Sequence, residues 1–522
     1  MTVTAHASTK TRRRIRVTEW IIFAVIVVAM VAVHLMFFFW PFRYRQVHPL
    51  LEQVFQSKVV VVNYHRTYFP HPGFVAEQVT FYRHGDTAIP PLATVKRMTV
   101  EGQWGMLLFH PHLLYEIRLE ALHVRIPPAG TKARGMDFDN GVVDTSQSAL
   151  HIETICADGA MVDFLRHGDS PIRFEFPSLQ VHDLQAGRPM QFDVRVEMPG
   201  PPGTVAASGQ MGPFRTSSYG TTPMSGNYKL ESADLSRLQG LAGHATGGGR
   251  FDGNFTRVAV TGKAAIPDFR ADGAHTVRLD ADYYVTVNAT NADVQIENAQ
   301  VRTGSSTVTA SGSVAGSPRT VALSITAKGA EVQDLLKIVE DAEPQAAGKM
   351  SFEAALQYRP GPERFLQRLQ LKGDASLEEL RFVHAKTQEP VNAFSARVRK
   401  DSPENRAAEE ESAENPEEVT LAARSQTRFE RGIAYFPDIH ATLPGADAHL
   451  HGTFNLLDTK IHLTGTVALQ KGISHAVTGW KAMLLKPLTP FFKKKEAGAV
   501  VPIAVTGTAA KPKVGSDLLH DK

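Results

Sequence analysis

The sequence has a single cysteine, Cys156, among its 522 residues. One thiol can form neither an intramolecular disulfide nor a cysteine zinc site, so stability has to come from strand pairing and apolar burial. An excess of charge of one sign is lacking as well, because 56 basic residues stand against 53 acidic ones, a net charge of +3. This balance provides no electrostatic basis for nucleic acid as a partner.

Motifs of the common catalytic sites are also absent from the sequence. The run Gly247–Gly249 lacks the spacing of a phosphate-binding loop, and neither G-x-S-x-G nor H-E-x-x-H occurs. His110 and His112 have no carboxylate or cysteine at ligand spacing. Asp280 and Asp282 share one strand face, where paired carboxylates are far more often solvated charges than acid–base groups. We therefore predict no enzyme activity, no metal and no cofactor.

Only one stretch is long and apolar enough for a membrane-spanning helix. Residues Ile21 to Trp40 contain one polar member, His34, and at about 1.5 Å per residue they match a hydrocarbon core of about 30 Å. The stretch is longer than the apolar core of a signal peptide and ends without a small-residue cleavage pattern. We therefore expect a retained single anchor, bounded by residues 20–41.

The charges that flank this anchor predict its orientation. Basic residues within 10–16 outweigh Arg43 and Arg45, so the N-terminus should be cytoplasmic and the remaining chain exported. Trp20 and Trp40 then fall at the two membrane interfaces, where aromatic side chains are enriched.

Alternation of apolar and polar residues predicts β-strands through most of the exported chain. The clearest example is 279–289 (LDADYYVTVNA), whose apolar residues share one face and whose polar residues share the other. Residues 293–302 and 306–314 repeat this pattern. The strands expected nearer the anchor are 74–82, 92–100 and 117–126. The fold class that we predict is mainly β, an elongated and curved antiparallel sheet with a few short helices after the anchor.

A short element with a central glycine recurs in strand contexts, as in VTGKA (260–264) and LTGTV (463–467). Its central glycines are Gly209, Gly262, Gly312, Gly373, Gly452, Gly465 and Gly507. Glycine inside a strand permits a bend, a bulge or the close approach of another backbone, which a long curved sheet requires. A wall of roughly 15–25 strands spaced about 4.8 Å apart would extend about 70–120 Å.

Helices are expected at few places. Residues 47–57 and 331–340 show apolar positions at helical spacing. A third candidate, 473–495, is broken by prolines and would either cap the end of the sheet or touch a membrane surface. The residues that would make this surface contact are Phe491, Phe492, Lys493, Lys494 and Lys495.

Residues 400–418 hold eight acidic and two basic residues with two prolines, a composition that predicts a disordered insertion. We accordingly divide the chain into six parts. They are a basic tail (1–19), the anchor (20–41), an N-terminal β region (42–130), a central β region (131–399), the insertion (400–418) and a C-terminal β region with its cap (419–522).

Several motifs resemble the AsmA-like family of bacterial envelope proteins. Near the anchor these are YHRTYFPHPG (64–73), ATVKRM (93–98) and LEALHVRIP (119–127), followed by IPDF (266–269). The most specific are KPLTPFFKKK (486–495), VPIAVTGT (501–508) and KPKVGSDL (511–518). These motifs are structural signatures, so the resemblance transfers no catalytic residue.

The resemblance implies an inner-membrane anchor, a periplasmic β-rich body and kinship with the TamB-related repeating-β-groove proteins that are proposed to carry phospholipids. Our first hypothesis is therefore a lipid-binding β-groove that serves phospholipid transport or outer-membrane homeostasis. The residues expected to line it are Tyr283, Val285, Val287, Val308 and Val314. The alternative is an envelope assembly scaffold, or a regulator of outer-membrane protein biogenesis, that binds protein partners and holds no lipid. A polysaccharide hydrolase on a β-solenoid is a third reading, and it would need a cleft with convergent carboxylates.

Overall fold

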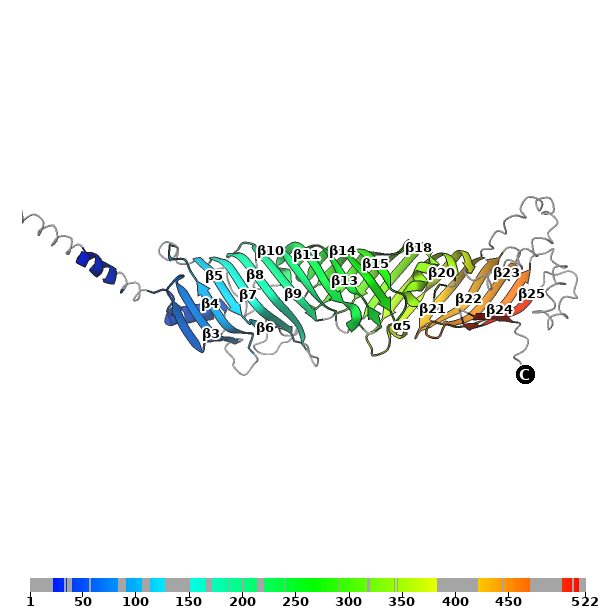
Figure 1. The fold of residues 1–522 in the computed structure, drawn as a ribbon, viewed down its shortest axis with the longest axis horizontal. Coiled ribbons are helices and arrows are strands. Elements are labelled where there is room, and N and C mark those ends of the chain that lie inside the picture. Colours follow the sequence, from blue (N-terminus) through cyan, green and yellow to red (C-terminus); the bar gives the residue numbers. More distant parts are fainter. Residues whose placement is uncertain are drawn as a thin grey trace, which may run out of the picture.

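The chain forms one elongated β body in a computed structural model (Figure 1). The structure describes residues 22–31, 34, 40–55, 58–82, 91–105, 113–126, 151–165, 171–185, 187–199, 201–213, 220–238, 240–289, 291–316, 320–341, 343–344, 346–382, 421–443, 446–469, 500–508 and 511–515. The predicted acidic insertion, the predicted cap at 473–495 with Phe491 to Lys495, and Ile21 lie outside these residues.

Residues 22–31 of the predicted anchor are helical and exposed. Within the described ranges, no helix combines the length and the apolar character needed to cross a membrane.

Helices are short and few, as expected from the sequence. The described ones after the anchor region are α2 (Tyr44–Phe55), η4 (Leu235–Arg237), α4 (Val332–Val339) and α5 (Phe365–Arg368). The helices predicted at 47–57 and 331–340 correspond to α2 and α4, whereas α5 was not predicted.

Strands make up almost all of the body. In its N-terminal part they are β1 (Lys58–Val60), β2 (Asn63–Thr67), β3 (Gly73–Tyr82), β4 (Ala93–Glu101), β5 (Leu113–Glu120), β6 (His123–Ile126), β7 (His151–Phe164) and β8 (Ile172–Gln185). In the middle they are β9 (Met190–Pro199), β10 (Pro202–Met211), β11 (Pro223–Asp234), β12 (Leu241–Ala242), β13 (His244–Asn254), β14 (Arg257–Ala271), β15 (Val277–Asn288), β16 (Asp293–Thr303), β17 (Ser306–Val314) and β18 (Val321–Glu331). The last are β19 (Ala346–Tyr358), β20 (Leu369–Phe382), β21 (Leu421–Glu430), β22 (Ile433–Leu443), β23 (Ala446–Asn455), β24 (Lys460–Leu469), β25 (Val500–Thr508) and β26 (Lys511–Gly515).

From β7 onward each long strand pairs antiparallel with the next one along the chain, and only β12 stands aside, on β14. The predicted all-antiparallel sheet needs one correction, because β5 and β6 both pair parallel to β7. The strand predicted at 117–126 is also wrong in one respect. It is divided into β5 and β6 at Ala121, which has a positive φ of 50°.

A compact aromatic core closes the end of the sheet next to the anchor. Trp40 is 1% exposed, and its ring lies 4.6 Å from that of Tyr68 and 5.5 Å from that of Trp104. Phe42 and Phe74 continue the cluster. The structure thus places Trp40 inside the folded body. The physical reason is that Tyr68 and Trp104, in the segments that follow β2 and β4, supply aromatic surface that buries the indole.

Candidate functional site

The feature that organises the sheet is a continuous line of apolar residues that are cross-strand partners from β3 to β26. We call this line the axial row. Each member faces the next across a strand pair, including one parallel pair. The members are Phe74, Val100, Ile117, Ile155, Val181, Phe192, Gly209, Gly226, Phe251, Val260, Val285, Ile296, Gly312, Leu323, Leu356, Leu371, Phe429, Ala434, Phe454, Ile461, Gly507 and Pro512.

Most of the axial row is only half-buried. Ile155, Val260, Ile296 and Leu356 are typical, with intermediate exposure, although all of their cross-strand partners in the row are apolar residues or glycine. In a filled two-sheet core, side chains at such positions would be packed from the opposite side and fully buried. The apolar face is therefore partly open to solvent along much of its length. We call it the groove face, after the groove that the sequence predicts there.

The five residues predicted to line a groove all lie on this face. Val285 belongs to the axial row itself, and Val287 faces Val294, which in turn faces Val314. Tyr283 faces Ala299, while Val308 faces Val301. All five are half-buried. The period-2 pattern thus assigned them to one face, as expected.

All seven glycines of the recurrent element also lie on the groove face. A Cβ added to Gly209, Gly312, Gly452 or Gly465 would overlap a carbonyl group of the neighbouring strand. At Gly262 the overlap would be with the hydroxyl of Tyr228. Glycine at these positions therefore permits a close approach of neighbouring atoms that a larger residue would block.

The opposite face of the sheet is polar and carries ion pairs. Asp282 lies 2.6 Å from Arg302 and 3.2 Å from Lys263, and Asp280 is bonded by Arg278 at 2.7 Å. These cations lower the pKa of both carboxyl groups. Asp280 and Asp282 are therefore charged, paired surface groups, which disfavours a role as a proton-transfer pair.

The strands end at two edges of the groove. We call the edge with the β11–β13, β14–β15, β16–β17 and β18–β19 connections the α4 rim. The edge with the β13–β14, β15–β16, β17–β18 and β19–β20 connections is the α5 rim.

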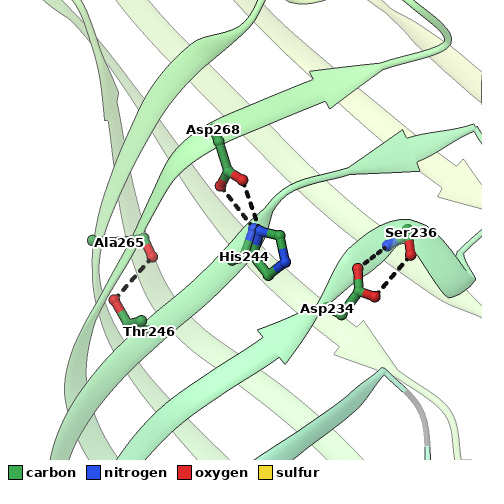
Figure 2. Close-up of polar contacts among 6 residues, drawn as sticks. All are labelled: Asp234, Ser236, His244, Thr246, Ala265 and Asp268. Carbon is green, nitrogen blue, oxygen red and sulfur yellow. Dashed lines mark hydrogen bonds and ion pairs between the residues drawn. The ribbon is translucent and has the colours of Figure 1, made fainter.

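Polar contacts order the α4 rim (Figure 2). The Asp268 carboxylate accepts a hydrogen bond from the His244 backbone N–H at 2.7 Å and lies 2.8 Å from its Nδ1. This carboxylate raises the pKa of His244. Nearby, Asp234 caps η4 through Ser236. The starts of β13 and η4 are thereby held at defined places along this rim.

Helix α4 is fixed to the same rim at its first turn. Asp334 accepts hydrogen bonds from the Ser305 backbone N–H, in the β16–β17 connection, and from the hydroxyl of Ser306, the first residue of β17, at 2.9 and 2.8 Å. At the other end of the helix, the Glu340 carbonyl accepts from His275 N–H at 3.3 Å. The Glu340 side chain is buried, and this burial raises its pKa.

The two rims meet at α5. The Leu366 backbone N–H in α5 donates to Asp272 Oδ2 in the β14–β15 connection at 2.8 Å. Gly240 on the α4 rim is pressed against Phe365, so that an added Cβ would lie 2.8 Å from the Phe365 nitrogen. Val339, at the end of α4, packs in the same cluster as Phe365 and Leu366. We call Gly240, Asp272, Val339, Phe365 and Leu366 the latch.

A buried ion pair lies apart from the groove's middle, on β6 to β8. Asp163 is 3% exposed, accepts two hydrogen bonds from Arg173 at 2.8 and 3.0 Å, and lies 2.8 Å from His123 Nε2. Arg173 lowers the pKa of Asp163 to about 2. The group is a permanent carboxylate with its acceptors satisfied, which favours a structural role.

In the part of the chain that the structure describes, no three His, Cys, Asp or Glu side chains are arranged to hold a metal ion. His110 and His112 lie outside that part. Cys156 is a free thiol on β7, and burial raises its pKa.

Sequence reasoning missed the latch and the aromatic core around Trp40. Leu366 and Asp272 are 94 residues apart, and no periodic pattern connects them. The sequence feature that marks the latch is Gly240 followed by Leu241 and Ala242. A glycine beside two apolar residues is too common to predict a contact between distant segments.

No protein-family model matches the chain, and no curated protein matches it either.

Proposed function

We propose that this chain is a single-pass protein of the bacterial inner membrane whose periplasmic groove binds phospholipid and serves lipid transport or outer-membrane homeostasis. The observation that carries the proposal is the axial row. It joins the anchor-proximal core at Phe74 to the last strand at Pro512 without a polar member. At about 4.8 Å per strand its contour is roughly 100 Å.

The chemistry of the groove fits acyl chains. Each methylene group kept from water is worth about 0.8 kcal/mol, so an apolar wall stabilises a lipid tail without a chemical step. The headgroup would remain in water at the mouth of the groove, between the rims. The AsmA-like motifs and the apolar segment that ends beside Trp40 support the same reading, because an anchor in this segment would bring the groove's first strands close to a membrane.

The alternative, a scaffold that binds envelope proteins and holds no lipid, would be favoured by a filled sandwich. The half-buried state of Val285, Val287, Val308 and Val314 supports an open groove instead. A scaffold would bind its protein partners without phospholipid. The two functions therefore differ in whether phospholipid copurifies with the protein.

The test is mass spectrometry of lipids that copurify with the full-length chain after detergent exchange. We expect selective enrichment of phospholipid compared with an unrelated single-pass envelope protein. Replacing Val285 and Val287 by Asp should abolish the enrichment, because two carboxylates would then face the acyl chains.

A matched control is available on the same strand. Tyr284→Asp puts a carboxylate on the opposite, polar face and should leave the bound phospholipid unchanged, whereas Val285→Asp should reduce it. The scaffold would be favoured if the folded wild-type protein carried no phospholipid. It would also be favoured if Tyr284→Asp and Val285→Asp lost bound phospholipid equally.

A further inference from the structure

The latch lies on the path that the axial row defines. Leu366 is 3% exposed and packs with Phe429 and Ala434, two row members that are themselves buried. Leu371 and Phe454, also in the row, border the same cluster. The side chains of the latch therefore occupy the groove floor at the place where an acyl chain would have to lie.

The latch closes the mouth as well as the floor. Asp272 comes from one rim and Leu366 from the other, and the hydrogen bond between them spans the opening. A lipid whose tails follow the axial row carries its headgroup through this opening. A bond that joins the rims blocks the headgroup even where the tails have room.

We propose that the latch is a gate that separates the groove into an anchor-proximal compartment and a C-terminal compartment, and that it must open for a phospholipid to pass. This inference rests on the proposed function. The anchor-proximal compartment ends at β19 and the C-terminal compartment begins at β23, because the latch covers the row at β20 to β22.

The contacts of the closed latch are suited to reversible opening. One hydrogen bond joins the rims directly, and Asp272 is held by its own N–H, which donates to the Gly240 carbonyl at 2.6 Å. Among the described residues, Asp272 Oδ1 and His275 Nε2 are buried without a hydrogen-bond partner. Opening would hydrate both atoms and recover the desolvation free energy that the closed state loses.

The two helices beside the gate, α4 and α5, differ in how firmly they are attached to the sheet. Asp334 ties α4 to the β16–β17 connection and the start of β17 through Ser305 and Ser306. Helix α5 is a single short turn that follows β19, and Arg368 stacks on Tyr358 behind it. We therefore assign the movement to α5 and the fixed frame to α4.

A covalent lock tests the gate. An ideal Cβ on Gly240 lies 2.9 Å from Phe365 Cβ and would overlap Asp272 Oδ1. The two Cβ atoms of a disulfide are about 3.8 Å apart, so the bond can form once the two segments separate by about 1 Å and the Asp272 carboxylate turns aside. Gly240→Cys and Phe365→Cys are combined with Cys156→Ala in the full-length chain. Gly240 has a φ of +82°, which strains any other residue, so the cysteine there can move away from the geometry of a disulfide. A short bismaleimide that joins the two thiols serves as a second lock.

The protein is reconstituted into vesicles that contain a photoreactive phosphatidylethanolamine, and labelled segments are located by mass spectrometry after illumination. We expect label at 190–211, before the latch, in every form of the protein. Label at 446–469, beyond the latch, should be lost in the disulfide form and restored by reductant in the same preparation. Asp272→Ala should bring label to 446–469 sooner.

The outcomes separate the gate from the groove. Equal label at 446–469 in locked and reduced protein overturns the gate and leaves the groove intact. Absence of label from both segments in the wild type overturns both. A singly substituted Phe365→Cys protein treated with the bismaleimide controls for the chemical modification, and it should be labelled in both segments.

Discussion

The hydroxyl groups of Tyr228 on β11 and Tyr283 on β15 hydrogen-bond to each other across two intervening strands. The residues between them in cross-strand register are Gly249 and Gly262. The phenol rings therefore extend along the groove floor, above two positions that have no side chain. Burial, followed by this hydrogen bond, raises the pKa of Tyr228, which favours its protonated phenol.

Gly262→Ala should destabilise β11 to β15, because its methyl group would overlap the Tyr228 hydroxyl. Overpacking of this kind costs about 1–3 kcal/mol. The loss should be smaller in a Tyr228→Phe background, since the phenylalanine lacks the overlapping oxygen. Hydrogen exchange of peptides from 244–271 measures the loss of stability in both backgrounds. If Gly262→Ala costs the same with and without Tyr228→Phe, the methyl group does not meet the Tyr228 hydroxyl and the proposed contact is wrong.

Gly465→Ala tests why glycine recurs on the groove face. An added Cβ would overlap the His449 carbonyl oxygen of β23, so we expect a loss of about 1–3 kcal/mol in local stability. Gly105→Ala is the matched control, because nothing lies within 4 Å of its added Cβ. Hydrogen-exchange rates in 446–469 should rise for Gly465→Ala and not for Gly105→Ala. Equal exchange in the two variants would mean that close approach of the neighbouring strand is not why glycine recurs on this face.

Trp40→Ala should loosen the end of the sheet next to the anchor. A fully buried aromatic side chain that is cut back to alanine costs about 3–5 kcal/mol. Phe69→Ala, at a side chain that is 89% exposed, should be nearly neutral. Limited proteolysis between residues 58 and 82 compares the two. Faster cleavage in the Phe69 variant, or none in the Trp40 variant, would argue against the buried position of Trp40.

The Asp163 pair predicts a pH dependence. The pKa of Asp163 falls from 3.8 to about 2 on folding. The ionised carboxylate therefore stabilises the folded state above pH 3.8, and this stabilisation is lost as the pH falls through about 2. The shift corresponds to about 2 kcal/mol. Exchange protection of 151–165 should differ between wild type and Asp163→Asn at pH 6 and converge towards pH 2. A difference that does not vary with pH would assign the effect to hydrogen bonding alone.

The latch supplies a stability readout that does not depend on lipid. Leu366→Ala removes the most buried side chain of the latch, and a leucine-to-alanine change in a packed site costs about 2–5 kcal/mol. Because the latch joins distant strands, exchange should rise both in 421–443 and in 268–276. A rise confined to the first segment would show that the rims are not coupled.

Much of the sheet could be predicted from the sequence alone, because side chains in a strand alternate between its faces. This rule put Val285 and Val287 on one face and Asp280 and Asp282 on the other, and the structure agrees. Helix α4 was predictable for a similar reason, since its apolar positions recur at helical spacing. The meander order also follows from local rules, because consecutive antiparallel strands need only short turns.

The tertiary structure decided what no local pattern contains. The parallel pairing of β5 and β6 with β7 depends on a long connection, and the position of Trp40 depends on aromatic residues farther along the chain, Tyr68 and Trp104, that pack against it. The latch joins Asp272 to Leu366 because the twist of the intervening strands brings opposite rims together. Twist accumulates over many strand pairs, so a contact across the groove is a property of the whole sheet and not of either segment.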